Sequence, residues 1–315
     1  MSTTDEPTTA ASTTVAPSGK QFAIAFEEQR AVVVEVGGGI RTYDVEGRAV
    51  LDGYAVDTQC TGARGTPLVP WPNRLADGRY RFDDVDYQVA LTEPAKHNAI
   101  HGFLRWRSWT AREHSASRVV MGTVLHPLMG YPFTLDVAVA YTLAAGGLTV
   151  QTTATNVGTA PCPYGAGQHP YLAAGTDLVD AYVLQVGAER WLPTDERGLP
   201  TGTRDVDGSG YDFRSARPVG DQQIDYAFTG LARDNDGLAW VRWTAPDGHQ
   251  SQLWLDESYP FVEIYTGDTL PPAQRRRGLG VEPMTCAPDA FRSGDGLIRL
   301  PPGESVSTSW GIRLG

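Results

Sequence analysis

Two residues have the chemistry of a general acid–base pair. His169 stands in the stretch GAGQHPYL, and Glu282 is the acidic residue of a nearly uncharged run from 278 to 288. Pro170 biases the backbone of His169 toward an extended conformation, so its ring can point into a site. Partial desolvation would raise the pKa of Glu282, as a general base requires. Taken alone, the histidine could equally be hydrogen-bonded at a strand start, and the carboxylate could be exposed on a turn.

Two further charged residues lie in similar surroundings. Arg74 occurs in PWPNRLADGRY, and Asp225 occurs in the aromatic stretch IDYAFTGL. Each has an ordinary alternative: Arg74 could form a surface ion pair, and Asp225 could cap a turn. An arginine and an aspartate that share one cavity can bind the hydroxyl groups of a polar ligand.

A pair of histidines, His97 and His101, has the i, i+4 spacing of a metal site on a helix. The HExxH pattern is absent, and Gly102 follows at once, so the sequence favours neither a helix nor a metal there. We therefore expect no metal at this pair of histidines.

These motifs together resemble the aldose 1-epimerase (galactose mutarotase) family. The segments PWPNRLADGRYRF, NAIHGF, QHPYL, IDYAF and VEPMTCAPDAF occur in that family's order, and the likeness runs from about Gln21 to the C-terminus. The resemblance implies an all-β fold, a large antiparallel β-sandwich of the supersandwich type, with a sugar cleft on one sheet and a monosaccharide as substrate. It also implies that the protein uses no metal and no organic cofactor.

The resemblance also assigns roles to residues. It implies that Glu282 is the catalytic base, that His169 is the proton donor and that His101 lies near the ring oxygen. It makes Arg74 and Asp225 ligands of sugar hydroxyls, and we expect three neighbours in the same motifs to bind substrate as well: Asn73, Gln168 and Tyr171.

Interconversion of anomers opens and recloses a hemiacetal ring. A base removes the proton of the C1 hydroxyl while an acid protonates the ring oxygen. A glutamate with an ordinary pKa of about 4.3 and an imidazole at about 6.5 can be ionised and protonated, respectively, near neutrality. We expect Glu282 and His169 to face each other across a gap one pyranose wide.

The elements that must position these residues are strands. Alternation of apolar residues predicts a hairpin of residues 22–26 and 31–36, another of 80–82 and 85–91, and a long hairpin of 133–141 and 148–154. Residues 238–240 and 253–255 predict a further pair, and 306–312 a closing strand. The irregular stretches 58–79, 92–108, 156–175 and 265–297 contain most of the site residues, so we expect these residues in loops.

Composition bounds the class of protein. The 315 residues are 41% hydrophobic and carry a net charge of −11, which disfavours nucleic acid as a partner. Residues 1–19 read as a disordered Thr/Ser/Pro tail before a single domain, 20–315. Neither a signal peptide nor a membrane span is evident, and three unpaired cysteines suit a reducing compartment, so we expect a cytoplasmic monomer or homodimer.

Three alternatives stay open. An inverting glycosidase could pair Asp225 with Glu282, although such chemistry needs no histidine. A non-catalytic carbohydrate-binding protein would keep Arg74 and the aromatic residues. An epimerase of a phosphorylated or sulfonated hexose could use Arg74 or the run Arg275 to Arg277 for a charged group at C6.

Overall fold

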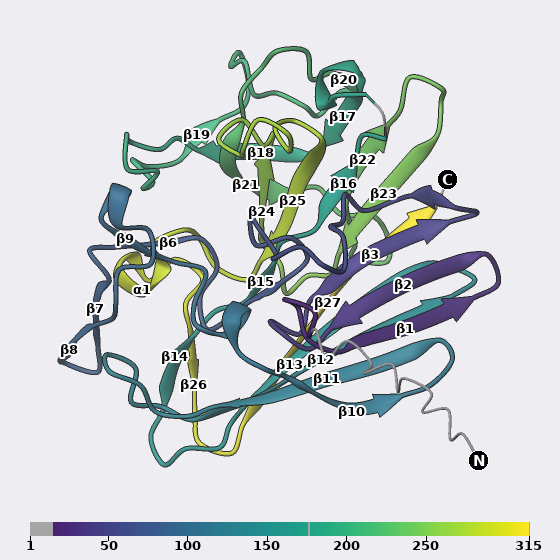
Figure 1. The fold of residues 1–315 in the computed structure, drawn as a ribbon. Helices are drawn as coiled ribbons and strands as arrows, with labels where there is room; N and C mark the ends of the chain where they lie inside the picture. The colour runs from purple at the N-terminus through teal and green to yellow at the C-terminus, as the bar shows by residue number, and fades with distance from the viewer. Residues whose placement is uncertain (1–14, 176, 315) are drawn as a thin grey trace, which may run out of the picture.

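The chain folds almost entirely into antiparallel β-strands (Figure 1). The computed structural model describes residues 15–175 and 177–314. Within them the helical elements are short: α1 (Ala290–Ser293) and the 3-10 turns η1 (Pro94–Lys96), η2 (Leu104–Trp106) and η3 (Val179–Ala181). The predicted all-β class is confirmed.

The largest sheet has nine strands. In spatial order they are β10 (Thr110–His114), β11 (Arg118–Leu125), β12 (Leu135–Ala144), β13 (Gly147–Asn156), β27 (Ser305–Leu314), β23 (Gln250–Leu255), β22 (Ala239–Thr244), β17 (Val183–Val186) and β20 (Arg217–Pro218). The closing strand β27 pairs with β13 and β23, so the chain's last strand joins the two halves of this sheet.

A second sheet of eight strands positions the chemistry. Its order is β19 (Arg204–Asp205), β18 (Ala188–Leu192), β21 (Asp225–Leu231), β24 (Phe261–Tyr265), β25 (Gly278–Met284), β15 (Gly167–Gln168) and β5 (Pro67–Leu68), with β16 (Tyr171–Ala173) also paired to β25.

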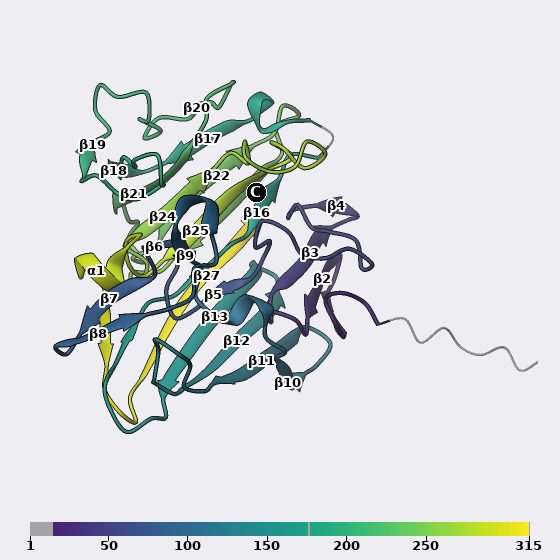
Figure 2. The ribbon, with the colours of Figure 1, turned by 60° about the vertical axis from the view of Figure 1, so that its left-hand side comes forward.

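Smaller sheets flank these two. A four-stranded sheet contains β1 (Gln21–Phe26), β2 (Gln29–Val34), β3 (Ile40–Val45) and β4 (Arg48–Ala49). Three pairs complete the fold: β6 (Arg74–Ala76) with β9 (Asn98–Ile100), β7 (Arg79–Phe82) with β8 (Val85–Gln88), and β14 (Cys162–Tyr164) with β26 (Ile298–Leu300). Figure 2 shows the four-stranded sheet on one side of the molecule, with β7, β8 and α1 on the other.

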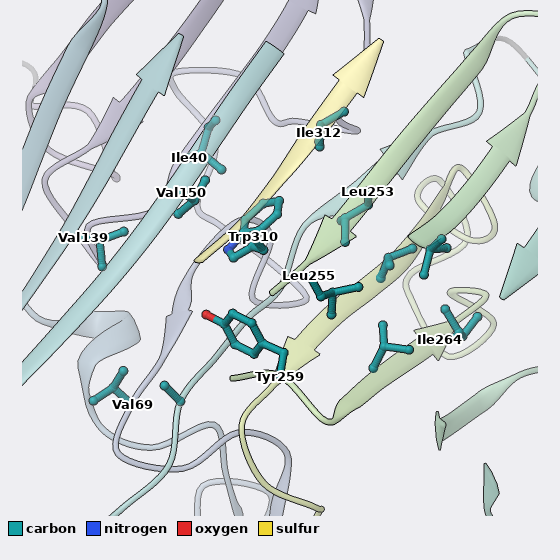
Figure 3. Packing of buried hydrophobic residues seen from close by; sticks show 14 of the residues in the cluster. Ile40, Val69, Val139, Val150, Leu253, Leu255, Tyr259, Ile264, Trp310 and Ile312 are labelled. Atoms are coloured by element: carbon teal, nitrogen blue, oxygen red, sulfur yellow. The ribbon is translucent and has the colours of Figure 1, made fainter. Parts of the chain in front are cut away.

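The core forms where alternate residues of the long strands meet. Tyr141 of β12 lies opposite Val150 of β13, and Val150 lies opposite Trp310 of β27. Figure 3 shows Trp310 beside Leu255 of β23, its partner on the other side. All these side chains are buried, and a single cluster of buried hydrophobic residues runs from Ile24 to Ile312. The period-two pattern predicted these hairpins because one face of each strand is buried.

All four stretches predicted to be irregular contain strands: β5 and β6 in 58–79, β9 in 92–108, β14 to β16 in 156–175, and β25 in 265–297. Residues 265–297 were expected to be irregular, yet they contain β25, an interior strand of the eight-stranded sheet. All seven residues of β25 are buried. A strand covered on both faces shows no alternation of apolar and polar residues, so the period-two criterion misses it. Glu282 therefore projects from a rigid strand and not from a loop.

The predicted tail, residues 1–19, falls mostly outside the described residues. Residues 16–19 form a turn in which the amide of Gly19 bonds the carbonyl of Ala16. Ser18 is buried, and its carbonyl accepts a bond from Val36, so the end of the predicted tail is ordered. No helix within the described residues is long and apolar enough to cross a membrane.

Candidate active site

Most of the predicted site residues line one cavity of about 270 Å³. This volume lies near the lower end of small-molecule sites, as suits a single sugar ring. The predicted residues that line it are Asn73, Arg74, His101, His169, Tyr171, Asp225 and Glu282. Only Gln168 of the predicted set is missing from the wall.

The eight-stranded sheet supplies the acidic side of the cavity. Strands β21, β24 and β25 are neighbours (Figure 1), with Glu263 of β24 directly opposite Glu282 and also opposite Ala227. Directly opposed residues share a sheet face, as do residues two apart on one strand. Asp225, two residues before Ala227, therefore lies on the same face as Glu263 and Glu282.

His169 lies between the short strands β15 and β16, both of which pair with β25. Successive side chains of an extended chain point to opposite sides, so His169 and Tyr171 face the cavity while Gln168 faces the core. Gln168 is fully buried, and its Nε2 donates to the carbonyl of Gly65 and to the hydroxyl of Tyr141. Gln168, which we predicted to bind substrate, therefore does not line this cavity.

The predicted acid and base touch each other. Nε2 of His169 lies 3.0 Å from Oε1 of Glu282, and both side chains are almost fully buried. The expected gap one pyranose wide between them is therefore wrong, because the two side chains are in direct contact.

Burial changes the proton affinities of this pair in opposite directions. Desolvation, together with the positive charges of Arg64 and Arg105, lowers the pKa of His169 to about 3. Desolvation, with the charge of Asp225, raises the pKa of Glu282 well above its ordinary value. The sequence predicted a charged pair, an imidazolium and a carboxylate. The structure instead favours a neutral imidazole beside a protonated carboxyl group, with one proton that can move between them.

His101 is fixed by an unusual backbone. Both His101 (φ 61°) and Asn73 (φ 54°) adopt the left-handed conformation. His101 donates its backbone N–H to the carbonyl of Asn73, and Nδ1 of its ring accepts the N–H of Asn73. Gly102 continues the turn at φ 62°, where a Cβ atom would lie 2.0 Å from the carbonyl oxygen of Val69. Such strain is typical of functional sites.

The cluster of His101, His169 and Glu282 has the composition of a metal site, with all ligand atoms within 4.8 Å of one another. The hydrogen bond to Nδ1 of His101 argues against a metal. A metal-binding histidine normally donates its second ring N–H, whereas Nδ1 here accepts a bond, so the proton of the neutral ring sits on Nε2. Burial lowers the pKa of His101 well below its ordinary value, which keeps this neutral form.

Arg74 lies between two carboxylates in the wall of the cavity. Its Nε lies 3.0 Å from Oε2 of Glu93, and its Nη1 lies 3.8 Å from Oδ2 of Asp225. The side-chain Oδ1 of Asn73 accepts the backbone N–H of Arg74. Arg74 and Asp225 are thus held together, and both line the cavity.

A stack of side chains supports His169 from behind. The ring of Tyr171 stacks on the imidazole with a distance of 4.8 Å between the ring centres. The guanidinium of Arg64 lies over the ring of Tyr171, 4.6 Å from its centre. Arg64 is paired with Asp52 at 3.0 Å, and the hydroxyl of Tyr171 donates to the carbonyl of Gly62. The imidazole is therefore held in one orientation.

Sequence reasoning missed three charged residues at the site: Glu93 and Arg105, which line the cavity, and Glu263, which lies opposite Glu282. Arg105 lines the cavity, and within the described chain it has no carboxylate at ion-pair distance. Glu263 is buried beside Glu282 in a strand whose five residues are all buried. The signal for Glu263 was present, since one acid in the apolar run FVEIY cannot be buried without a partner.

His97, by contrast, lies outside this cavity. Its Nδ1 lies 2.8 Å from Oδ1 of Asp77, and its side chain is exposed. A larger cavity of about 490 Å³ opens elsewhere, beside Tyr182 and Trp243. Arg48 and Asp247 in its wall are paired with each other at 2.6 Å. The other acidic and basic residues that line it, Glu46, Asp177 and His249, are exposed, so this cavity contains no buried acid–base pair.

Fold and site together define an all-β protein with a buried histidine–glutamate pair at the base of a small polar cavity. The aldose 1-epimerase family model matches residues 21–313, so the chain belongs to the aldose 1-epimerase family.

Relatives and solved structures agree with this assignment. The chain is 34% identical over 288 residues to the uncharacterized protein YihR of Escherichia coli, covering 91% of each. It is 27% identical to the human galactose mutarotase, covering 84% of this chain and 82% of that protein. A GalM/aldose epimerase homologue from C. elegans shares the fold with a TM-score of 0.84 at 19% identity, over 94% of this chain and 98% of that one.

Proposed function

We propose that this protein is an isomerase that interconverts the α and β anomers of a hexose. The observation that carries the proposal is the contact between Glu282 and His169, buried at the base of a cavity that also presents Arg74 and Asp225. Family membership supports the same reaction class.

The shared proton of the pair explains how both steps can occur together. When the C1 hydroxyl donates a hydrogen bond to Glu282, the ionised carboxylate is stabilised and the shared proton moves to His169. His169 then protonates the ring oxygen as Glu282 removes the proton of the C1 hydroxyl; the C1–O5 bond breaks and the aldehyde forms at C1. Rotation about C1–C2 exposes the other face of the aldehyde, and the reverse transfers close the ring.

Other groups hold the sugar in place. Nε2–H of His101 is a donor for the ring oxygen, since Nδ1 already accepts a bond. Arg74 and Asp225 offer complementary donors and acceptors to neighbouring hydroxyls. Positioned proton transfer contributes about 10²- to 10⁴-fold, which suffices for a reaction that is already measurable in water.

The test is to follow freshly dissolved α-glucose and α-galactose by polarimetry or by NMR exchange, with and without the protein. We expect faster equilibration in proportion to protein concentration. An unchanged rate in the presence of folded protein that binds the sugar would refute the proposal and favour a carbohydrate-binding role. Release of reducing sugar from an oligosaccharide would instead identify a glycosidase.

A second candidate substrate is a hexose with an anionic group, and Arg105 favours it. This guanidinium lines the cavity, and within the described chain no carboxylate pairs with it. Arg74 already faces Glu93 and Asp225, and none of Arg275 to Arg277 lines the cavity. A comparison of neutral with phosphorylated and sulfonated hexoses tests this candidate. A matched Arg105→Gln variant should lose the preference for the anion.

A further inference from the structure

A buried carboxyl group beside the catalytic pair has no role in the reaction described above. Glu263 lies at the centre of β24 and is 2% exposed. It is directly opposite Glu282 on β25, and it shares the sheet face with Asp225 of β21. Three carboxyl groups on neighbouring strands therefore point toward one small volume.

The charges around this group do not balance if all three carboxyl groups are ionised. The arginine that reaches them, Arg74, lies 3.8 Å from Asp225 and is also bound to Glu93. Glu282 keeps its proton in the resting pair, and Glu263 and Asp225, held close together in a buried site, cannot both be charged either.

Glu263 is the acid best placed to keep it. One side of its carboxyl group lies within hydrogen-bonding reach of Asp225, while Oε2 is buried with no protein partner. Asp225 is more exposed and faces Arg74, and Glu282 faces His169. Two carboxyl groups that share a hydrogen bond need a proton between them, and the more buried one, far from a cation, holds it. Burial and the charges of Asp225 and Glu282 raise the pKa of Glu263 well above its ordinary value.

We propose that Glu263 is a positioning residue that stays protonated and donates its O–H to Asp225. The bond fixes the carboxylate of Asp225 between Glu263 and Arg74, in the orientation that receives the sugar hydroxyls. Because Glu263 carries no charge, Glu282 can ionise when the substrate arrives. The inference rests on the proposed mutarotase function, and it adds a residue whose contact with the sugar is indirect.

Two substitutions separate this role from the alternatives. Glu263→Gln keeps the length, the neutrality and an N–H donor for Asp225. Glu263→Met keeps the length but removes the donor. For Glu263→Gln we expect KM and kcat within about threefold of wild type, because the hydrogen bond to Asp225 is retained. For Glu263→Met we expect KM to rise about tenfold or more, the loss of a hydrogen bond to a charged group, with a smaller change in kcat.

Two kinetic results would overturn the proposal. If both substitutions change KM and kcat to the same extent, the carboxyl group itself reacts or must be charged. A Glu263→Met enzyme with unchanged KM would mean that the bond to Asp225 does not position the substrate. Circular dichroism and thermal melting establish that each variant is folded; if Glu263→Met does not fold, Glu263→Gln and the spectroscopic test below still decide.

A spectroscopic test does not depend on activity. Besides the signal of the protonated Glu282, infrared or carboxyl ¹³C NMR spectra of the wild-type protein at pH 7 should contain the signal of a second protonated carboxyl group, which Glu263→Gln lacks. A Glu257→Gln variant, altered at an exposed glutamate, should retain this signal. Absence of the signal from the wild-type protein refutes the inference about Glu263. A wild-type protein that shows the signal but does not accelerate anomer exchange refutes the proposed function instead.

Discussion

Replacement of Glu282 by glutamine gives the sharpest test of the acid–base pair. The amide has nearly the size of the carboxyl group, so a side chain that is 2% exposed is exchanged without a cavity. The contact with Nε2 of His169, 3.0 Å away, can persist as a neutral hydrogen bond. What disappears is the group that exchanges a proton with the C1 hydroxyl.

The expected effect is a loss of about 10²- to 10⁴-fold in kcat, or about 3 to 5 kcal/mol in the barrier. Sugar affinity should change little, because Arg74 and Asp225 are intact. The fold should also be retained, because Glu282 is already held largely in its neutral form.

The assay is saturation transfer between the two anomeric protons of glucose, in dilute buffer so that the uncatalysed rate stays low. Affinity for the sugar is measured on the same samples by ligand-observed NMR. Glu257→Gln, at an exposed site, is the matched control and should behave as wild type. Near-normal turnover by Glu282→Gln would refute the reasoning, and so would loss of activity that is explained entirely by loss of binding.

Other predictions concern the same pair and its surroundings. His169→Asn should lower turnover by about 100-fold or more, and a rate within a few-fold of wild type would exclude a proton-donor role. Arg74→Ala should mainly raise KM, because its guanidinium faces Asp225 at the rim; a fall in kcat at constant KM would contradict that role. Burial lowers the pKa of His169 to about 3, so this histidine does not change its protonation between pH 7 and 5. After the uncatalysed rate is subtracted, kcat/KM should therefore not fall over this range. A fall centred near pH 6.5 would contradict the neutral pair. In the unfolded chain this histidine gains a proton below about pH 6.5, whereas in the folded protein it stays neutral. As the pH falls below about 6.5, the unfolding free energy of wild type should therefore decrease, relative to that of His169→Asn, by up to about 1.4 kcal/mol per pH unit. Urea denaturation at pH 7, 6 and 5 measures this, and the same difference in unfolding free energy between the two proteins at all three pH values would disprove it.

Much of the fold follows from local patterns in the sequence. The hairpin of β12 and β13 was predictable because each strand buries alternate residues. The sequence also contained the motifs that carry Arg74, His101, His169, Asp225 and Glu282, and their order along the chain was enough to suggest the family.

Tertiary structure alone decided how these residues meet. Local pattern failed for β25, because a strand buried on both faces has no alternation, and it therefore gave no sign that Glu282 sits opposite Glu263. Gln168 points away from the cavity because its neighbour His169 points into it. Pairing of the flanking strands with β25 decides which of the two faces the cavity. The proton shared by Glu282 and His169 likewise depends on burial. Burial arises when segments that are distant in sequence pack together, so it cannot be predicted from any one of these segments alone.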